Sequence, residues 1–387
     1  MKNEINLSEA RVELIRLTSV LEQCSSHMQA EPYENRLREI CNSLLARGDD
    51  SDIRSATAYF QKLDPDGYAY DKLSTIAEDC AESVEDEEGA ALLLLIPILA
   101  WSRYRNYYGV LDETTLADIA DCVRENFATP RARVVMGAHM ISYDHLISSN
   151  LAVRDLVQLM RRQEHGSAVP LSGLMREAPP PDFADSRYIL CCVAASKRED
   201  LFRGTDETLV DAARGMMNFC LKTHEILELT MLGSVFEVQP AGGYYRTWRD
   251  TEPVMRAWAL TSLVDFAESM GFAAADLVAT IGLFVPGPRD SNPMSELRIS
   301  LSRKTDRDSV LCGISWGVLP SEIDAFTQTA RDLLDSKRIT DVVEHEQSFR
   351  LEWCEDCGAP LYATPSGLVV HNELPEDSGM PEVPTLN

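Results

Sequence analysis

The sequence lacks the short motifs that mark several common enzyme classes. It contains no phosphate-binding loop of the Walker type, no Gly-x-Gly-x-x-Gly fingerprint and no His-Glu-x-x-His motif. Each of these motifs places ligand-binding groups at a fixed spacing, so its absence removes support for the corresponding enzymes. The P-loop, dinucleotide-binding and zinc-protease classes are therefore unsupported, and an enzyme of unfamiliar type stays open.

Basic residues are scarce relative to acidic ones. The 387-residue chain has 36 Lys and Arg residues against 62 Asp and Glu residues, which gives a formal net charge of -26 at pH 7. Proteins bind phosphate backbones mainly through basic groups, so we expect no direct binding of nucleic acid. An acidic surface of this kind suits high solubility or a basic protein partner.

Long apolar runs and dense cysteines are also missing. The most apolar run, residues 90–101, contains Pro97 and is shorter than the roughly 20 residues that cross a bilayer, so it predicts a buried helix and no membrane span. The first six residues lack the pattern of a signal peptide. Ten cysteines are too few for a disulfide scaffold in this chain, and we expect a reducing, cytoplasmic location.

Residues 1–162 predict a helical domain. Apolar residues such as Leu37 and Cys41 recur there at three- and four-residue steps, which is the spacing of one helix face. Ser8 and Asp112 each precede such a run. Their side-chain oxygens suit the N-cap role, in which they accept from an otherwise unpaired backbone N–H.

Beyond a proline-rich linker at residues 163–184, the pattern changes. Residues 188–194 form a continuous apolar run that predicts a strand buried on both faces. Residues 296–301 and 309–316 flank a charged turn, which predicts a hairpin, and we interpret Arg298 there as part of a solvated face. We therefore predict an α+β fold with an all-helical N-terminal domain at residues 1–162, an α+β domain at residues 185–350, and a zinc-ribbon-like knuckle with an acidic tail at residues 351–387.

The C-terminal segment carries the clearest chemical signal. Cys354 and Cys357 form a Cys-x-x-Cys pair followed by Gly358, a spacing that lets two thiolates converge on one tetrahedral ion. A turn and a short apolar run then return the chain to His371. We predict a structural zinc site that holds the C-terminal tail.

The fourth metal ligand is undecided in the sequence. His345 is the first candidate, followed by Cys312 and Glu373. The alternative interpretation is a pair of reduced thiols in a tight turn, because the chain has no second Cys-x-x-Cys. A thioredoxin-like redox pair is disfavoured, since such a motif should open a helix.

Two further segments concentrate polar or charged residues. Residues 78–88 are dominated by acids, which we interpret as a solvated helix end, with a docking surface for a basic partner as the alternative. Residues 244–250 combine aromatic rings with charged side chains. Packing of a helix entry is the favoured interpretation there, and a ligand pocket that uses Arg246, Arg249 and Asp250 is the alternative.

Three segments together resemble a bacterial protein family. They are Leu95-Ile-Pro-Ile-Leu-Ala-Trp-Ser-Arg-Tyr104, Arg187-Tyr-Ile-Leu190, and Cys354-Glu-Asp-Cys-Gly-Ala-Pro-Leu-Tyr362 with the later Val370-His371. The family is catalogued as domain of unknown function 2863, and the likeness runs in order from about residue 92 to residue 376. The resemblance implies a cytoplasmic bacterial protein and carries no activity with it.

The leading hypothesis from the sequence is a non-enzymatic bacterial cytoplasmic binding or scaffold protein, with an acidic surface for a protein partner and a structural zinc knuckle. The alternative is an enzyme of unfamiliar type with its site between the helical and α+β domains. A cleft that gathers Arg246, Arg249 and Asp250 with perturbed titratable groups would favour the enzyme. Scattering of these side chains would count against it.

Overall fold

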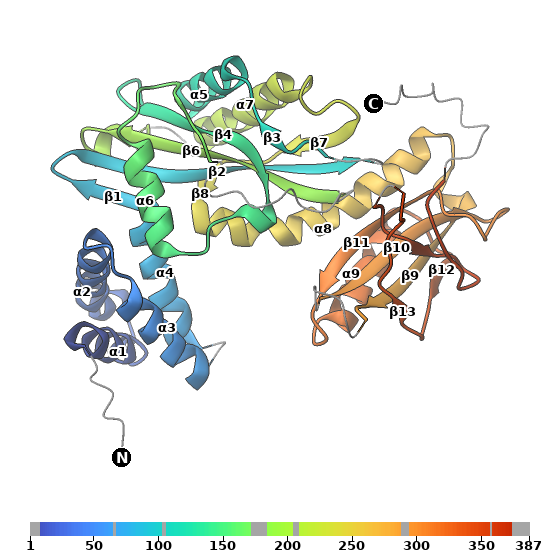
Figure 1. Ribbon diagram of the computed structural model, residues 1–387, viewed down its shortest axis with the longest axis horizontal. Coiled ribbons are helices and arrows are strands. Elements are labelled where there is room, and N and C mark those ends of the chain that lie inside the picture. The colour runs from blue at the N-terminus through green and yellow to red at the C-terminus, as the bar shows by residue number, and fades with distance from the viewer. Residues whose placement is uncertain are drawn as a thin grey trace.

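The computed structural model describes residues 8–64, 67–102, 106–171, 184–203, 209–287, 294–356 and 358–373. It contains a unit of four helices, a first β-sheet and a second β-sheet, and the long helix α8 (Tyr244–Ser269) runs from the first sheet to the second (Figure 1). The protein is thus of mixed α+β class, as the sequence predicts.

The helical unit comprises α1 (Glu9–Leu21), α2 (His27–Ala46), α3 (Ser51–Leu63) and α4 (Tyr68–Glu82). The predicted cap at Ser8 is confirmed, because its Oγ accepts from the backbone N–H of Arg11 at 3.1 Å. Leu37 and Cys41 are fully buried, so the three- and four-residue spacing did identify a core face.

The first sheet has eight strands in the described part of the chain. Its main path runs β1-β2-β6-β4-β3, with β6 antiparallel between β2 and β4. β5 pairs with β4, while β7 and β8 pair with β2. The strands are β1 (Ser83–Asp86), β2 (Gly89–Ser102), β3 (Gly109–Val110), β4 (Arg133–Ser142), β5 (Ala168–Val169), β6 (Ala184–Ala195), β7 (Ser234–Val238) and β8 (Gly242–Gly243).

The apolar run at residues 90–101 forms most of β2, so the helix predicted for it is wrong. Pro97 stands opposite Tyr188 in the ladder, and its carbonyl accepts from the backbone N–H of Gln239 at 2.8 Å. Both faces of β2 are covered, and a strand of this kind shows no alternation of polar and apolar residues. Its pattern is therefore the same as that of a buried helix.

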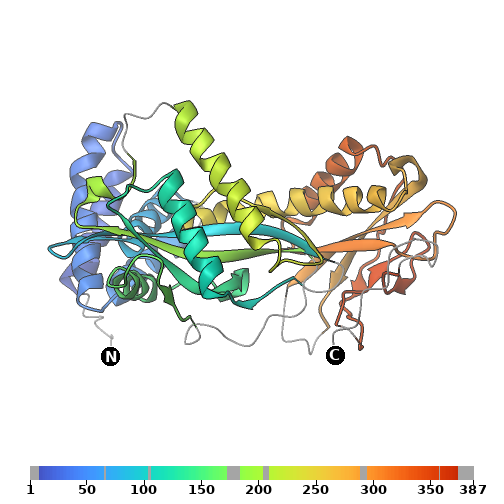
Figure 2. The same ribbon diagram turned by 90° about the horizontal axis from the view of Figure 1, so that it is seen from above.

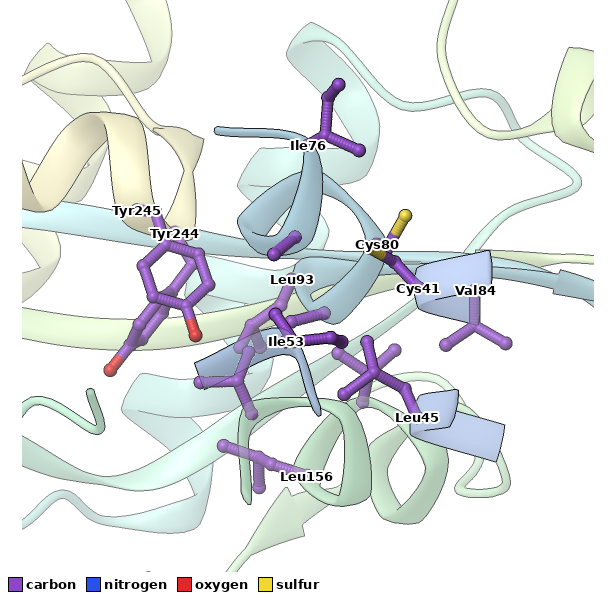
Figure 3. Close-up of a cluster of buried hydrophobic side chains, with 14 of the residues drawn as sticks. Cys41, Leu45, Ile53, Ile76, Cys80, Val84, Leu93, Leu156, Tyr244 and Tyr245 are labelled. Atoms are coloured by element: carbon purple, nitrogen blue, oxygen red, sulfur yellow. The ribbon is translucent and has the colours of Figure 1, made fainter. Parts of the chain in front are cut away.

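Helices cover both faces of the first sheet (Figures 1 and 2). α5 (Glu113–Asn126), which Asp112 caps as predicted, and α7 (Leu209–Leu227) pack on one face, where Ile96 and Ile98 belong to the core. α4, α6 (Asn150–Met160) and the start of α8 pack on the other face, where Leu93 and Leu95 belong to a second core (Figure 3).

The first sheet takes strands from both sides of the predicted linker. β2 and β4 precede residues 163–184, β5 lies within them, and β6, which contains the predicted strand, begins at Ala184; residues 172–183 are outside the described part of the chain. Strands β1 to β4 thus lie within residues 1–162. The prediction of an all-helical domain over residues 1–162 is therefore wrong. The all-helical unit ends with α4 at Glu82.

The second sheet runs in the order β11-β10-β9-β12, with β13 also paired to β9. The predicted hairpin is confirmed, because β10 and β11 pair antiparallel with Leu297 opposite Trp316. Helix α9 and the end of α8 contribute to its core. The elements are β9 (Leu277–Val285), β10 (Ser295–Arg303), β11 (Cys312–Val318), α9 (Ile323–Ser336), β12 (Val342–Glu344) and β13 (Phe349–Arg350), followed by a small hairpin of β14 (Tyr362–Ala363) and β15 (Val369–Val370).

Candidate binding groove and predicted metal site

The predicted metal knuckle contains a tight turn around Cys354. The backbone N–H of Gly358 donates to the carbonyl of Cys354 at 2.9 Å, and the N–H of Cys354 donates to the carbonyl of Ala359 at 2.7 Å. Gly358 has φ +73°, a backbone conformation that favours glycine. Cys357 lies outside the described residues, and His371 directly follows β15.

Other predicted ligands occupy different surroundings. Nε2 of His345 lies 2.9 Å from the carbonyl oxygen of Thr364, which can only accept, so Nε2 carries the proton and Nδ1 remains for a metal. Cys312 is fully buried in the core of the second sheet, with its Sγ 3.9 Å from the carbonyl oxygen of Leu263. In the described part of the chain, no group of three or more His, Cys, Asp or Glu residues could hold a metal ion.

Arg298 anchors the knuckle to the second sheet, which corrects its interpretation as a solvated residue. Its side chain is 1% exposed, and Nη1 donates to the carbonyl oxygens of Glu352 at 2.7 Å and Leu361 at 2.6 Å. These two residues lie on opposite sides of the turn. Its Nε donates to the carboxylate of Glu296 at 2.8 Å, and its guanidinium lies over the ring of Phe284. Protein contacts therefore hold both arms of the knuckle.

The acidic segment at residues 78–88 is largely paired within the chain. Arg161, the residue that follows α6, donates to both carboxylate oxygens of Asp86 at 2.8 Å and to Glu88 at 3.0 Å. Asp79 pairs with Arg38 at 3.4 Å. These ion pairs connect α4 and β1 to neighbouring helices. Only part of the segment's negative charge is therefore free to meet a partner.

The aromatic and charged side chains at the start of α8 lie in different surroundings. Tyr244 and Tyr245 are buried, as the packing interpretation predicts. Arg246 and Asp250 are exposed and pair with each other at 3.3 Å, whereas Arg249 pairs with Glu78 on α4. None of these three charged side chains lines the large groove beside strand β1, so that groove does not gather them as the enzyme hypothesis expects.

A groove of about 1230 Å³ lies between the helical unit and the first sheet. Its walls come from α2, the end of α4, β1, the start of β2, and the short helix η2 (Arg198–Asp200) with the residues after it. Three consecutive residues of the edge strand, Ser83, Val84 and Glu85, line it. Its charged lining residues are Asp79, Glu82, Glu85, Glu199, Arg38 and Arg198.

Two titratable groups in this groove have perturbed pKa values. Burial raises the pKa of Glu82 to about 7, and a hydrogen bond from the backbone N–H of Tyr245 at 2.9 Å opposes this rise. Burial also raises the pKa of Cys80 to about 11, so the thiol stays protonated at neutral pH and is a poor nucleophile. No local sequence pattern predicts the groove or the raised pKa values of these two groups.

One sequence pattern with a possible catalytic meaning has a structural explanation instead. Gly313-Ile-Ser315-Trp-Gly317 matches Gly-x-Ser-x-Gly, in which an exposed nucleophilic serine sits on a sharp turn between a strand and a helix. All five residues lie within β11, so Ser315 is on no such turn. Gly313 leaves room for the ring of Tyr362, because a Cβ there would lie 2.4 Å from that ring.

A family model described as protein of unknown function (DUF2863) matches residues 1–384. This match includes the helical unit, whose sequence carries little of the resemblance. No curated protein and no solved structure matches the chain. None of the helices in the described ranges is long and apolar enough to span a membrane.

Proposed function

The chain belongs to the family described as protein of unknown function (DUF2863), and we propose that it is a non-enzymatic binding protein that takes up an extended segment of a basic protein partner along strand β1. The observation that carries this proposal is the groove along that strand. We further propose a bacterial cytoplasmic location, which the family resemblance and buried thiols such as Cys191 and Cys192 support.

Strand β1 has a side that is available for pairing. In the described part of the chain it pairs only with β2, and Ser83, Val84 and Glu85 line the groove. An unpaired strand edge presents backbone N–H and C=O groups to which an extended peptide can add as a further strand. Arg154 already donates to the carbonyl of Ser83, so we expect pairing to centre on Glu85.

The lining of the groove favours a basic segment with alternating apolar residues. Its four carboxylates outnumber its two guanidinium groups, and Arg38 and Arg198 already pair with Asp79 and Glu85. Apolar lining comes from Val84, Leu92 and Phe202 among others. Side chains of a strand alternate between two faces, so one set can meet the carboxylates and the other the apolar lining.

A labelled nine-residue peptide of alternating lysine and valine provides the test. We expect it to bind the protein in a fluorescence anisotropy titration, and we expect the matching glutamate–valine peptide not to bind. Reversing two groove charges with Glu85→Lys and Glu199→Lys should weaken binding at least about tenfold, or roughly 1.4 kcal/mol. The affinity should also fall as salt is raised, because exposed charges are screened.

The control is a variant with the same charge change elsewhere, Glu228→Lys with Glu268→Lys. Both residues are exposed and do not line the groove, so this variant should bind the basic peptide nearly as well as the original protein. Equal loss in both double variants would show that net charge alone attracts the peptide, and the proposal for β1 would fail.

We also propose that the knuckle is zinc-ribbon-like and holds structural zinc through Cys354, Cys357 and His371, with His345 as the first candidate for the fourth ligand. The turn at Cys354 and the glycine conformation at Gly358 support this, because zinc knuckles need such a turn. We expect about one zinc ion per purified chain by elemental analysis. The double variant Cys354→Ser, Cys357→Ser should lose it.

The matched control for the metal is the variant Cys24→Ser, Cys220→Ser. Like Cys354, both are only partly buried, but Cys24 lies between α1 and α2 and Cys220 lies on α7, far along the chain from the knuckle. Zinc retained in the knuckle variant, or lost equally in both variants, would contradict the site.

A further inference from the structure

Helix α7 carries a stripe of apolar side chains that face water. Val210, Met217 and Leu221 are separated by seven and four residues, the spacing that keeps side chains on one face of a helix. Leu229 and Leu232 follow in the turn that leads to β7. These five side chains are 59–82% exposed. Exposed apolar residues are common singly, whereas a row of them marks a surface that another protein covers.

The opposite face of α7 is fixed within the protein. Phe219 and Leu227 are fully buried in the core on this side of the first sheet. The ring of His224 stacks on the ring of Phe236 in β7, with the ring centres 4.1 Å apart. The apolar stripe therefore points away from the sheet, and Figure 2 shows no described helix or strand over the outer side of α7.

Charge favours a second copy of this chain as the occupant of the stripe. The whole chain has a formal net charge of -26, so two copies repel each other over most of their surfaces. Helix α7 is an exception, because its two acidic residues, Asp211 and Glu225, are balanced by Arg214 and Lys222. Two copies can approach along this helix without a net repulsion, whereas a strongly charged partner gains nothing from a helix without net charge.

Antiparallel packing of α7 on its copy matches both the apolar and the charged side chains. A two-fold axis at the midpoint between Met217 and Leu221 places Met217 of each copy beside Leu221 of the other. Arg214 lies five residues before that midpoint and Glu225 lies six residues after it, so each Arg214 meets Glu225 of the other copy. Arg214 is exposed and pairs with Asp211 on its own helix at 3.3 Å, and its several N–H donors can serve both carboxylates.

We propose that α7 forms the interface of a two-fold symmetric dimer, in which a second copy of the chain covers the apolar stripe. Val210 of each copy meets Leu229 of the other, since they lie nine residues before and ten residues after the midpoint. None of the residues of this interface lines the groove at β1, so the inference does not depend on the proposed function.

The size of the helix sets the strength of this dimer. A helix of 19 residues is about 28 Å long. Contact along that length buries on the order of 500 Å² on each copy, which is at the low end of specific interfaces. The dimer is therefore reversible, with a dissociation constant in the micromolar range.

Sedimentation equilibrium of the full chain at a series of concentrations tests the proposal, and we expect an equilibrium between monomer and dimer. Met217→Gln with Leu221→Gln removes the apolar centre of the interface without changing its charge, and it should weaken the dimer at least about tenfold. The matched control is Met28→Gln with Leu159→Gln, which makes the same changes at exposed residues on α2 and α6 and should leave the equilibrium unchanged.

Charge reversal tests the antiparallel arrangement. Arg214→Glu places two carboxylates side by side in each half of the interface and should weaken the dimer. Adding Glu225→Arg to that variant restores an ion pair with its partners exchanged, so the affinity should recover. All the substituted residues are exposed, and circular dichroism checks that each variant is folded. The proposal would be overturned by a chain that stays monomeric at every concentration, by no greater weakening in the Met217 and Leu221 variant than in its control, or by no recovery in the charge-exchanged variant.

Discussion

Replacing Arg298 with methionine is expected to lower the free energy of unfolding by about 3–5 kcal/mol, the range found when one partner of a buried ion pair is removed. The change leaves the carboxylate of Glu296 without its partner and removes the donor that the carbonyl oxygens of Glu352 and Leu361 share. Urea unfolding measures the loss. Hydrogen exchange should show faster exchange at residues 351–363, because both arms of the knuckle lose their anchor.

Arg350→Met is the control for this prediction. Arg350 is exposed on β13, and its replacement should change stability by less than about 0.5 kcal/mol. A small effect of Arg298→Met, with unchanged exchange at the knuckle, would show that the tail is held mainly by other contacts. One such contact is the hydrogen bond from Ser300 Oγ to the carbonyl of Ala363 at 2.8 Å.

Local patterns in the sequence predicted those parts of the fold that local chemistry decides. Ser8 and Asp112 cap helices because their side chains reach backbone N–H groups three residues ahead. The hairpin of β10 and β11 follows from two apolar runs and a charged turn. Strand β2 was missed because burial on both faces leaves no periodicity, and only its pairing with β6, more than 80 residues later, distinguishes it from a helix.

The sites depend even more on distant contacts. The turn at Cys354 was predictable because its glycine and its spacing lie within five residues. The role of Arg298 was not, since its acceptors lie 54 and 63 residues away. The acidic segment presents the same difficulty, because Asp86 meets Arg161 across 75 residues. Composition alone could not show that much of this segment's charge is paired within the chain.

Replacing Gly89 with alanine is expected to destabilise the protein by about 3 kcal/mol or more, because two unfavourable effects combine. Gly89 has φ +122°, a conformation that side chains rarely adopt, and a Cβ there would lie 2.4 Å from the carbonyl oxygen of Ala195. That oxygen belongs to the backbone of β6 and cannot move aside alone. Thermal and urea unfolding of the variant measure the effect.

Gly48→Ala separates the two effects. Gly48 also has a positive φ, +73°, but a Cβ at this position would have nothing within 4 Å, so the replacement should cost only about 1 kcal/mol of backbone strain. If both variants lost the same free energy of unfolding, the close contact between the new Cβ and the Ala195 carbonyl would contribute nothing to the loss. Gly89 also stands opposite Asp86 at the end of the β1–β2 hairpin. The Gly89 variant should therefore lose affinity for the basic peptide at β1, whereas the Gly48 variant should keep it.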